Sequence, residues 1–181
     1  MKIRETGIEG LIEILPTVLH DDRGWFLESY NKDKFDSLNL KLNFVQDNLS
    51  FSKSGVLRGL HFQLKPFEQG KLVKVISGEV LDIAMDIRPN SSTFGQHIKV
   101  LLTAEKQNML FIPEGFAHGF VAIKDSYLFY KCTGTYNKDY DTGIAYDDPE
   151  LNIDWGIKSP KISEKDLNLQ SFQSYKSSIG L

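Results

Sequence analysis

Apolar and polar residues alternate with a period of two through the middle of the chain, which is the pattern of a β-strand whose two faces meet different surroundings. The clearest example is residues 80–87, in which four large apolar side chains share one face and two aspartates fall on the other. We expect a half-buried strand there, with a partly acidic second face. The same alternation predicts strands at residues 98–102, 109–112 and 127–133.

Gly, Pro, Asn and Asp separate these segments at short intervals, as in RPNSS at 88–92 and PEG at 113–115. Short strands with a turn signal about every 8–12 residues are typical of a β-sandwich or barrel, not of alternating strands and helices. The sequence therefore predicts an all-β fold of this kind.

Helical signal is confined to two short stretches, KDKFDSLNLK at 32–41 and SEKDLNLQSF at 163–172. In the second stretch, Ser163 is a suitable N-cap, and Asp166 follows three residues later. We expect one or two helical turns from each stretch.

Length and composition predict one globular domain over residues 1–181, with 41% hydrophobic and 25% charged residues and no internal repeat. The net charge of −3 gives no general attraction for nucleic acid or an anionic membrane, and neither is expected as a partner. An anionic ligand would need a local cluster of cations. Arginine occurs at only four positions, and two of them, Arg23 and Arg58, precede a glycine.

The lone Cys132 excludes a disulfide within the chain and a cysteine-based metal site, and it is expected to be a small buried thiol. The first residues, MKIRETGIEGLIEIL, lack the apolar core of a signal peptide. No apolar run reaches the roughly 18 residues that span a bilayer. We therefore expect a cytoplasmic location.

The stretch SGVLRGLHFQLKPFEQGKLVKVISG at 54–78 places polar groups on segments that otherwise have the pattern of buried strands. A glycine within a strand indicates a bulge or a close backbone approach, so Gly59 would let Arg58 and His61 serve one cavity. Lys71 begins the next strand and would face the same space. The alternative is a core histidine satisfied by one hydrogen bond, with both cations extending to a rim.

Two further candidates follow later in the chain. His118 lies in FIPEGFAHGF among phenylalanines and glycines, where it serves a ligand or, alternatively, bonds a backbone carbonyl. Tyr130 becomes a possible proton donor if it shares a cavity-facing side with Leu128 and Cys132. The alternative for this tyrosine is ordinary packing.

The spacing around His61 argues against a metal. His61-Phe62-Gln63 has an amide where a cupin-type metal site has a second histidine, and no glutamate precedes Lys71 at the expected interval. The nearby cations would also repel a divalent ion. The residues alone leave open which carboxylate accompanies His61, because Asp82 and Asp86 are as eligible as any more distant one.

Taken together, the motifs resemble the dTDP-4-dehydrorhamnose 3,5-epimerases in order and spacing over roughly residues 2 to 172. The motifs that carry this resemblance are DDRGWFLESY, FVQDNLSFSKSGVLRGLHFQ, QGKLVKVISGEVLDIAMDIR, STFG, IPEGFAHGF, YKCT, DDPELNIDW and SEKD. The resemblance implies a cupin-like jelly roll that forms a homodimer and acts without a metal or redox cofactor. It also implies a dTDP-linked 4-keto-6-deoxy sugar as substrate, inverted at carbons 3 and 5.

By this resemblance, His61 is the base, Tyr130 is the acid on the opposite face of the sugar, and Asp166 orients His61. Lys71 would stabilise the enolate oxygen. The residues implied in holding the nucleotide and sugar are Arg23, Glu28, Gln46, Asn48, Arg58, His118, Asp141 and Lys165. The N-terminal segment MKIRETGIEGLIEILP is the implied edge strand that completes a partner's sheet.

The chemistry of enolisation needs such a set. A proton beside a ketone is removed at a useful rate only if the enolate is stabilised as it forms. Each donor to the enolate oxygen contributes about 10²–10³-fold to the rate. A positioned base contributes about 10²–10⁴-fold, and an unperturbed histidine, with a pKa near 6.5, accepts a proton at neutral pH.

The sequence departs from the family pattern at Gly134-Thr135, before Tyr136, which affects contacts near the sugar or nucleotide. Two alternatives stay open: an epimerase of a single carbon, and a non-catalytic cupin that binds a nucleotide sugar.

Overall fold

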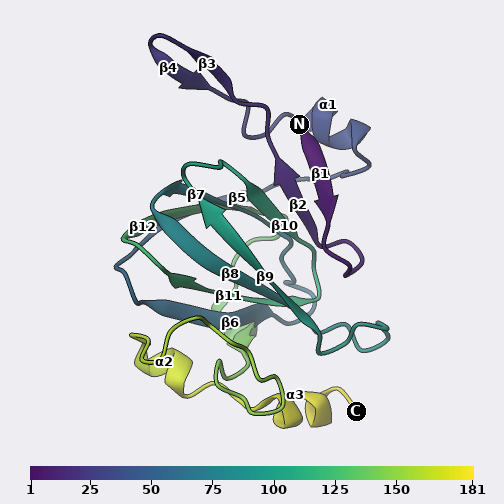
Figure 1. Cartoon of the computed structure of the whole chain (residues 1–181). Helices are drawn as coiled ribbons and strands as arrows, with labels where there is room; N and C mark the ends of the chain where they lie inside the picture. Colours follow the sequence, from purple (N-terminus) through teal and green to yellow (C-terminus); the bar gives the residue numbers. More distant parts are fainter.

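The computed structural model describes residues 1–181 and consists mainly of two antiparallel β-sheets packed face to face (Figure 1). The six-stranded sheet has the order β1-β2-β10-β7-β12-β5. Its strands are β1 (Lys2–Glu5), β2 (Ile12–Leu15), β10 (Met109–Ile112), β7 (Lys71–Ser77), β12 (Ser126–Cys132) and β5 (Gln46–Ser52). The sandwich predicted from the strand pattern is confirmed.

The five-stranded sheet has the order β13-β6-β11-β8-β9. Its strands are β13 (Asp141–Gly143), β6 (Leu57–Gln63), β11 (Phe116–Ala122), β8 (Glu79–Asp86) and β9 (His97–Thr103). A separate hairpin of β3 (Leu19–Asp21) and β4 (Gly24–Phe26) projects away from the sandwich (Figure 1).

The main core fills the space between the two sheets, where Val73 and Leu110 of one sheet pack with Ala84 and Phe120 of the other. A second apolar cluster lies on the outer face of the five-stranded sheet, under the C-terminal part of the chain. A third lies on the outer face of the six-stranded sheet, beneath α1 (Lys32–Ser37).

The expectation of a half-buried strand at residues 80–87 is wrong in one respect, because both faces of β8 are buried. Asp82 and Asp86 point into the sandwich and are fully buried. The opposite face, with Ile83 and Met85, is covered by Trp155 and other side chains of the C-terminal segment. Alternation along one strand cannot reveal a cover supplied from 70 residues away.

The two predicted helical stretches are confirmed as short helices. In the second stretch, α2 (Glu164–Leu167) begins after Ser163, whose hydroxyl accepts the Asp166 amide at 3.1 Å. A further helix, α3 (Phe172–Ser178), begins where that stretch ends, and η1 (Lys138–Tyr140) is a single 3₁₀ turn. No helix has the length and apolarity needed to cross a membrane.

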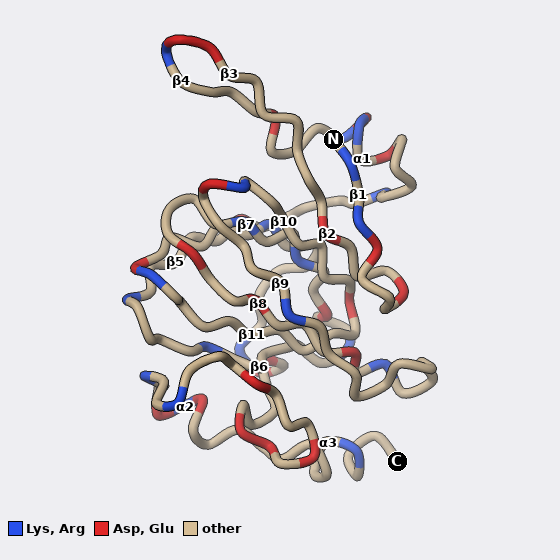
Figure 2. The backbone as a smooth tube through the Cα atoms, viewed as in Figure 1, with Lys and Arg blue, Asp and Glu red and all other residues tan.

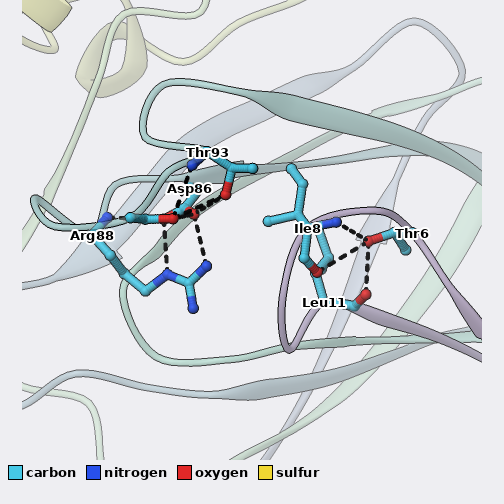
Figure 3. A network of polar contacts seen from close by, with 7 residues as sticks. Thr6, Ile8, Leu11, Asp86, Arg88 and Thr93 are labelled. Carbon is cyan, nitrogen blue, oxygen red and sulfur yellow. Dashed lines mark hydrogen bonds and ion pairs between the residues drawn. The ribbon is translucent and has the colours of Figure 1, made fainter.

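A buried carboxylate fixes the loop after β8 (Figure 3). Asp86 accepts hydrogen bonds from Arg88 Nε at 2.9 Å, Arg88 Nη2 at 2.7 Å and Thr93 Oγ1 at 2.6 Å. The Arg88 guanidinium also lies over the Phe116 ring, 4.8 Å from its centroid. On the other side of Figure 3, Thr6 closes the turn between β1 and β2 by donating to the Leu11 carbonyl.

The Asp86 cluster gives a prediction for acid stability. Burial raises the pKa of Asp86, but its hydrogen bonds outweigh burial and lower the pKa from 3.8 to about 2. The resulting stability is present above pH 3.8 and is lost as the pH falls through about 2. It amounts to about 2 kcal/mol. Urea unfolding of Asp86→Asn at several pH values should lack this share of the pH dependence, and identical pH dependence in wild type and variant would contradict the assignment.

Candidate active site

The imidazole of His61 is held by a buried carboxylate from a distant part of the chain. In β6, His61 lies directly opposite His118 of β11. Its Nε2 is 2.8 Å from Asp166 Oδ1, and the other carboxylate oxygen, Oδ2, accepts the Gly59 amide at 3.2 Å. Burial raises the pKa of Asp166, but the hydrogen bond and charge of His61 lower it below 3.8 overall. The carboxylate therefore stays ionised and fixes the ring, with Nδ1 left free of protein partners.

Gly59 produces the irregularity that places His61. Its φ is +130°, and a Cβ added there would lie 2.4 Å from Gly119 Cα and 2.9 Å from the His118 carbonyl oxygen. The pairing of β6 with β11 shifts register at this point. As a result, Arg58 and His61 line one hollow, as Gly59 in the strand pattern predicted.

Replacing this glycine gives a prediction for both stability and activity. Gly59→Ala should lower the free energy of unfolding by about 2–4 kcal/mol, because strain at positive φ adds to a backbone clash. It should also reduce activity, because His61 is two residues away. Gly7→Ala is the matched control: Gly7 also has positive φ, but an added Cβ meets open space. Its cost should be about 1 kcal/mol, with activity unchanged. Equal effects in chemical denaturation would contradict this account.

A second histidine–carboxylate pair lies beside the first. His118 Nε2 is 3.0 Å and 2.9 Å from the two oxygens of Asp82, and both side chains are buried. The alternative in which His118 bonds a backbone carbonyl through its ring is therefore not what the structure shows. With Asp82 paired to His118 and Asp86 paired to Arg88, only Asp166 accompanies His61.

The facing sheet presents a lysine and a tyrosine to the same interior. Lys71 of β7 is directly opposite Cys132 of β12, which is opposite Gln46 of β5. The next row on that face contains Tyr130 and Asn48. Because side chains two apart share a face, these five residues project from one side of the sheet. Tyr130 packs against the main core together with Leu128 and lies on the face that the sequence prediction required.

Burial shifts the pKa of both Lys71 and Tyr130. Burial lowers the pKa of the Lys71 ammonium below 10.5, while Cys132, Asp141 and Asp82 act in the opposite direction without reversing it. Burial raises the pKa of the Tyr130 phenol above 10.0, so that the phenol is protonated at neutral pH. The interior therefore combines a cation that gives up its proton more readily than an ordinary lysine with a neutral acid.

Polar residues join the edges of the two sheets at the mouth of this interior. Arg58 of β6 donates to Ser52 Oγ of β5 at 3.0 Å and so spans the gap. Asp141 of β13 forms an ion pair with Lys165 of α2 and accepts the Tyr136 hydroxyl at 3.2 Å. A hollow of about 430 Å³ opens here, lined by Val56, Leu57, Arg58, His61, Lys161, Ile162, Ser163, Lys165 and Asp166.

Two amide side chains of β5, Gln46 and Asn48, lie next to this mouth. Gln46 Nε2 donates to Asn48 Oδ1 at 3.0 Å, and Gln46 Oε1 accepts the Tyr136 amide at 2.8 Å. Tyr136 was not singled out as a site residue from the sequence, although an exposed aromatic beside Asp141 is suited to stack on a planar base. The only signal for it was its place among several tyrosines beyond β12.

Two sequence-predicted residues do not join this site within one chain. Arg23 lies at the tip of the projecting hairpin and pairs with Asp21. Glu28 follows the hairpin and pairs with Lys34 of α1. Neither contacts any residue of the mouth described above.

At Gly134-Thr135, where the sequence departs from the family pattern, the contacts of this chain are made by the backbone. The Gly134 carbonyl accepts Gln69 Nε2 at 2.8 Å, and the Thr135 carbonyl accepts Gln63 Nε2 at 3.3 Å. Both bonds use the backbone and do not depend on the side chain present. A Cβ at Gly134 would lie 2.7 Å from the Glu68 carbonyl oxygen, so a glycine suits the close approach of these two loops.

The fold and this constellation define an acid–base enzyme built on a cupin-like β-sandwich. The family described as dTDP-4-dehydrorhamnose 3,5-epimerase matches residues 5–174, and the chain belongs to this family. A dTDP-4-dehydrorhamnose 3,5-epimerase of Methanothermobacter thermautotrophicus is 50% identical over 169 residues, which cover 91% of this chain and 90% of that protein.

Solved structures agree with this membership. The dTDP-6-deoxy-D-glucose-3,5-epimerase of Legionella pneumophila, in complex with dTDP-4-keto-L-rhamnose, superposes with a TM-score of 0.93 at 41% identity, covering 98% of this chain and 96% of that one. A 3'-monoepimerase of Streptomyces bikiniensis, in complex with dTDP-quinovose, superposes with a TM-score of 0.88 at 28% identity, covering 97% and 89%.

Proposed function

We propose that this chain inverts carbons 3 and 5 of dTDP-4-dehydro-6-deoxy-D-glucose, giving dTDP-4-dehydro-L-rhamnose for dTDP-L-rhamnose biosynthesis. The observation that carries this proposal is the Asp166-held imidazole of His61 on one sheet, with Lys71 and Tyr130 on the facing sheet. A sugar between the two sheets would meet a base from one side and an acid from the other.

At each carbon, the free Nδ1 of His61 removes the proton next to the 4-keto group. The electron pair of the broken C–H bond moves to the carbonyl oxygen and forms an enolate, whose charge the Lys71 ammonium stabilises. Asp166 stabilises the imidazolium. The phenol of Tyr130 then protonates the carbon from the opposite face, and the configuration is inverted. Solvent then takes the extra proton from His61 and returns a proton to Tyr130, so the reaction consumes no redox equivalent and needs no cofactor.

The mouth residues supply binding for the nucleotide and sugar. The diphosphate carries about two negative charges, and Arg58 and Lys165 are two cations in reach of it, one from each side of the mouth. Gln46, Asn48 and Asp141 offer hydrogen bonds to the sugar or base, and His118 does so from the interior. This local cluster explains how a chain with a net charge of −3 holds an anion.

Supplying dTDP-4-keto-6-deoxyglucose together with a matching reductase tests the proposal. The expected product is dTDP-L-rhamnose, identified by mass and NMR. Formation of no rhamnose product while dTDP still binds would instead favour a non-catalytic nucleotide-sugar binder.

A single-carbon epimerase is the second candidate, and the similarity to a 3'-monoepimerase is the observation that favours considering it. Incubation in heavy water separates the two enzymes. The proposed enzyme exchanges hydrogen at carbons 3 and 5, whereas a single-carbon enzyme incorporates deuterium at one of them only.

We further infer that the working form is a homodimer located in the cytoplasm, a reducing compartment in which the unpaired Cys132 stays a free thiol. The projecting hairpin exposes 54% of Trp25 and 63% of Phe26, and the outer face of the six-stranded sheet exposes 65% of Leu49. A second copy would cover such apolar surface. The N-terminal segment forms β1 and β2 of this chain's own sheet, with β1 at its edge, so its pairing with a partner stays a prediction.

The same dimer would bring Arg23 and Glu28 to a substrate, because the hairpin of one copy reaches beyond its own sandwich. Light scattering should give twice the monomer mass, and Trp25→Ser with Phe26→Ser should weaken the dimer and dTDP binding together. A wild-type monomer with full activity would contradict this inference.

A further inference from the structure

The hollow beside His61 is lined by one more cation than the two, Arg58 and Lys165, that the proposed function assigns to the diphosphate. Three cations line it: Arg58, Lys161 and Lys165. The only acid among its lining residues is Asp166, which is buried and turned toward His61 and the Gly59 amide. Figure 2 shows Lys and Arg positions on α2 and close to it, beside the edge of β6.

Lys161 is the one of these cations that has no partner in the chain. Lys165 forms an ion pair with Asp141, and Arg58 donates to Ser52 Oγ and to the Phe51 carbonyl. The side chain of Lys161 is exposed and takes part in no hydrogen bond or ion pair. Because the other two cations already have partners, the ammonium of Lys161 is the one most available to a ligand.

The backbone of Lys161 is fixed even though its side chain is free. Its amide donates to the Gly55 carbonyl at 2.7 Å, and its carbonyl accepts the Leu57 amide at 2.9 Å. These bonds form an isolated parallel bridge with Val56 at the start of β6. The side chain of Lys161 therefore extends from a fixed backbone position next to the strand that carries Arg58 and His61.

We propose that Lys161 is a further phosphate-binding residue of the substrate site and contacts the diphosphate of the nucleotide sugar. The identity of this ligand rests on the proposed function. A lysine binds phosphate as a point charge and needs no fixed fork of donors, so a flexible side chain suffices. The diphosphate does not change during epimerisation. Lys161 therefore holds substrate and transition state equally and acts on KM, not on kcat.

The test compares Lys161→Gln with Lys158→Gln, which removes the same charge from an exposed lysine three residues away and outside the hollow. Titration with dTDP should give a Kd about fivefold higher for Lys161→Gln, the size of one exposed charge contact. Its KM should rise by the same factor. The Kd for thymidine, which lacks the diphosphate, should stay at the wild-type value. Lys158→Gln should match wild type in all three.

Equal dTDP affinity in the two variants would overturn the proposal. An equal loss for dTDP and thymidine would also overturn it, because it would show a structural effect and not a phosphate contact. Lys161→Arg should restore most of the dTDP affinity. Since dTDP binding is read without turnover, a chain that binds dTDP but fails to epimerise would refute the proposed function while leaving the Lys161 contact measurable.

Discussion

His61→Asn is expected to lower kcat by about 10³–10⁴-fold, because it removes both the base and the imidazolium that Asp166 stabilises. Asparagine is smaller than histidine and loses the contact of Nε2 with Asp166, but it is polar and Asp166 keeps its hydrogen bond from the Gly59 amide, so the fold should survive. The Kd for dTDP should stay within about twofold of wild type, since the nucleotide is held by other groups. The measurements are steady-state kinetics with the coupled reductase and titration with dTDP.

The second histidine supplies a control for the first. His118→Asn removes the same chemical group from the adjacent strand, opposite His61, but leaves the His61–Asp166 pair in place. It should impair substrate binding more than it lowers kcat. If His61→Asn retained activity while His118→Asn lost it, the base would have to be reassigned to the His118–Asp82 pair.

Lys71→Met is expected to lower kcat by about 10²–10³-fold, the loss that accompanies removal of one donor to a developing oxyanion. Methionine has a similar length and removes only the charge. Lys74→Met is the matched control, because Lys74 lies on the same strand, is buried, and also has its pKa lowered by burial. Its side chain is on the other face of the sheet, so activity should stay within about twofold of wild type.

The pH dependence of the same lysine gives an independent check. The ammonium is the active form, and burial lowers the pKa of Lys71 below 10.5. Activity should therefore fall as the pH rises, at a lower pH than an ordinary lysine would titrate. Burial raises the pKa of the Tyr130 phenol above 10.0, which moves its deprotonation to higher pH, opposite to the shift of Lys71. Lys71→Arg should retain part of the activity and move this alkaline limb to higher pH, and an unmoved limb would assign it to another group.

Local patterns along the chain were sufficient to predict much of the site. The period-two alternation predicted the strands, and a glycine between a cation and a histidine predicted the irregularity at Gly59. The same alternation put Tyr130 on one face with Leu128 and Cys132 but did not say whether that face meets the interior. These features depend on neighbours within a few residues, which is the range over which a strand pattern carries information.

Features that depend on distant parts of the chain were not predictable from such patterns. The residues alone left the partner of His61 open among several aspartates, and only family resemblance indicated Asp166, which lies 105 positions away. The buried outer face of β8 depends on the C-terminal cover, and the position of Arg23 depends on a hairpin that leaves the sandwich. These features depend on how distant segments are arranged in space, which composition and periodicity do not encode.

Hydrogen exchange at carbon 3 of dTDP-4-keto-6-deoxyglucose in heavy water tests the role of His61 most directly, because it reports removal of the proton without requiring completed turnover. Wild type should incorporate deuterium there, and His61→Asn should incorporate none above the background rate. Exchange at the wild-type rate in His61→Asn would show that another group removes the proton, and the account would be contradicted.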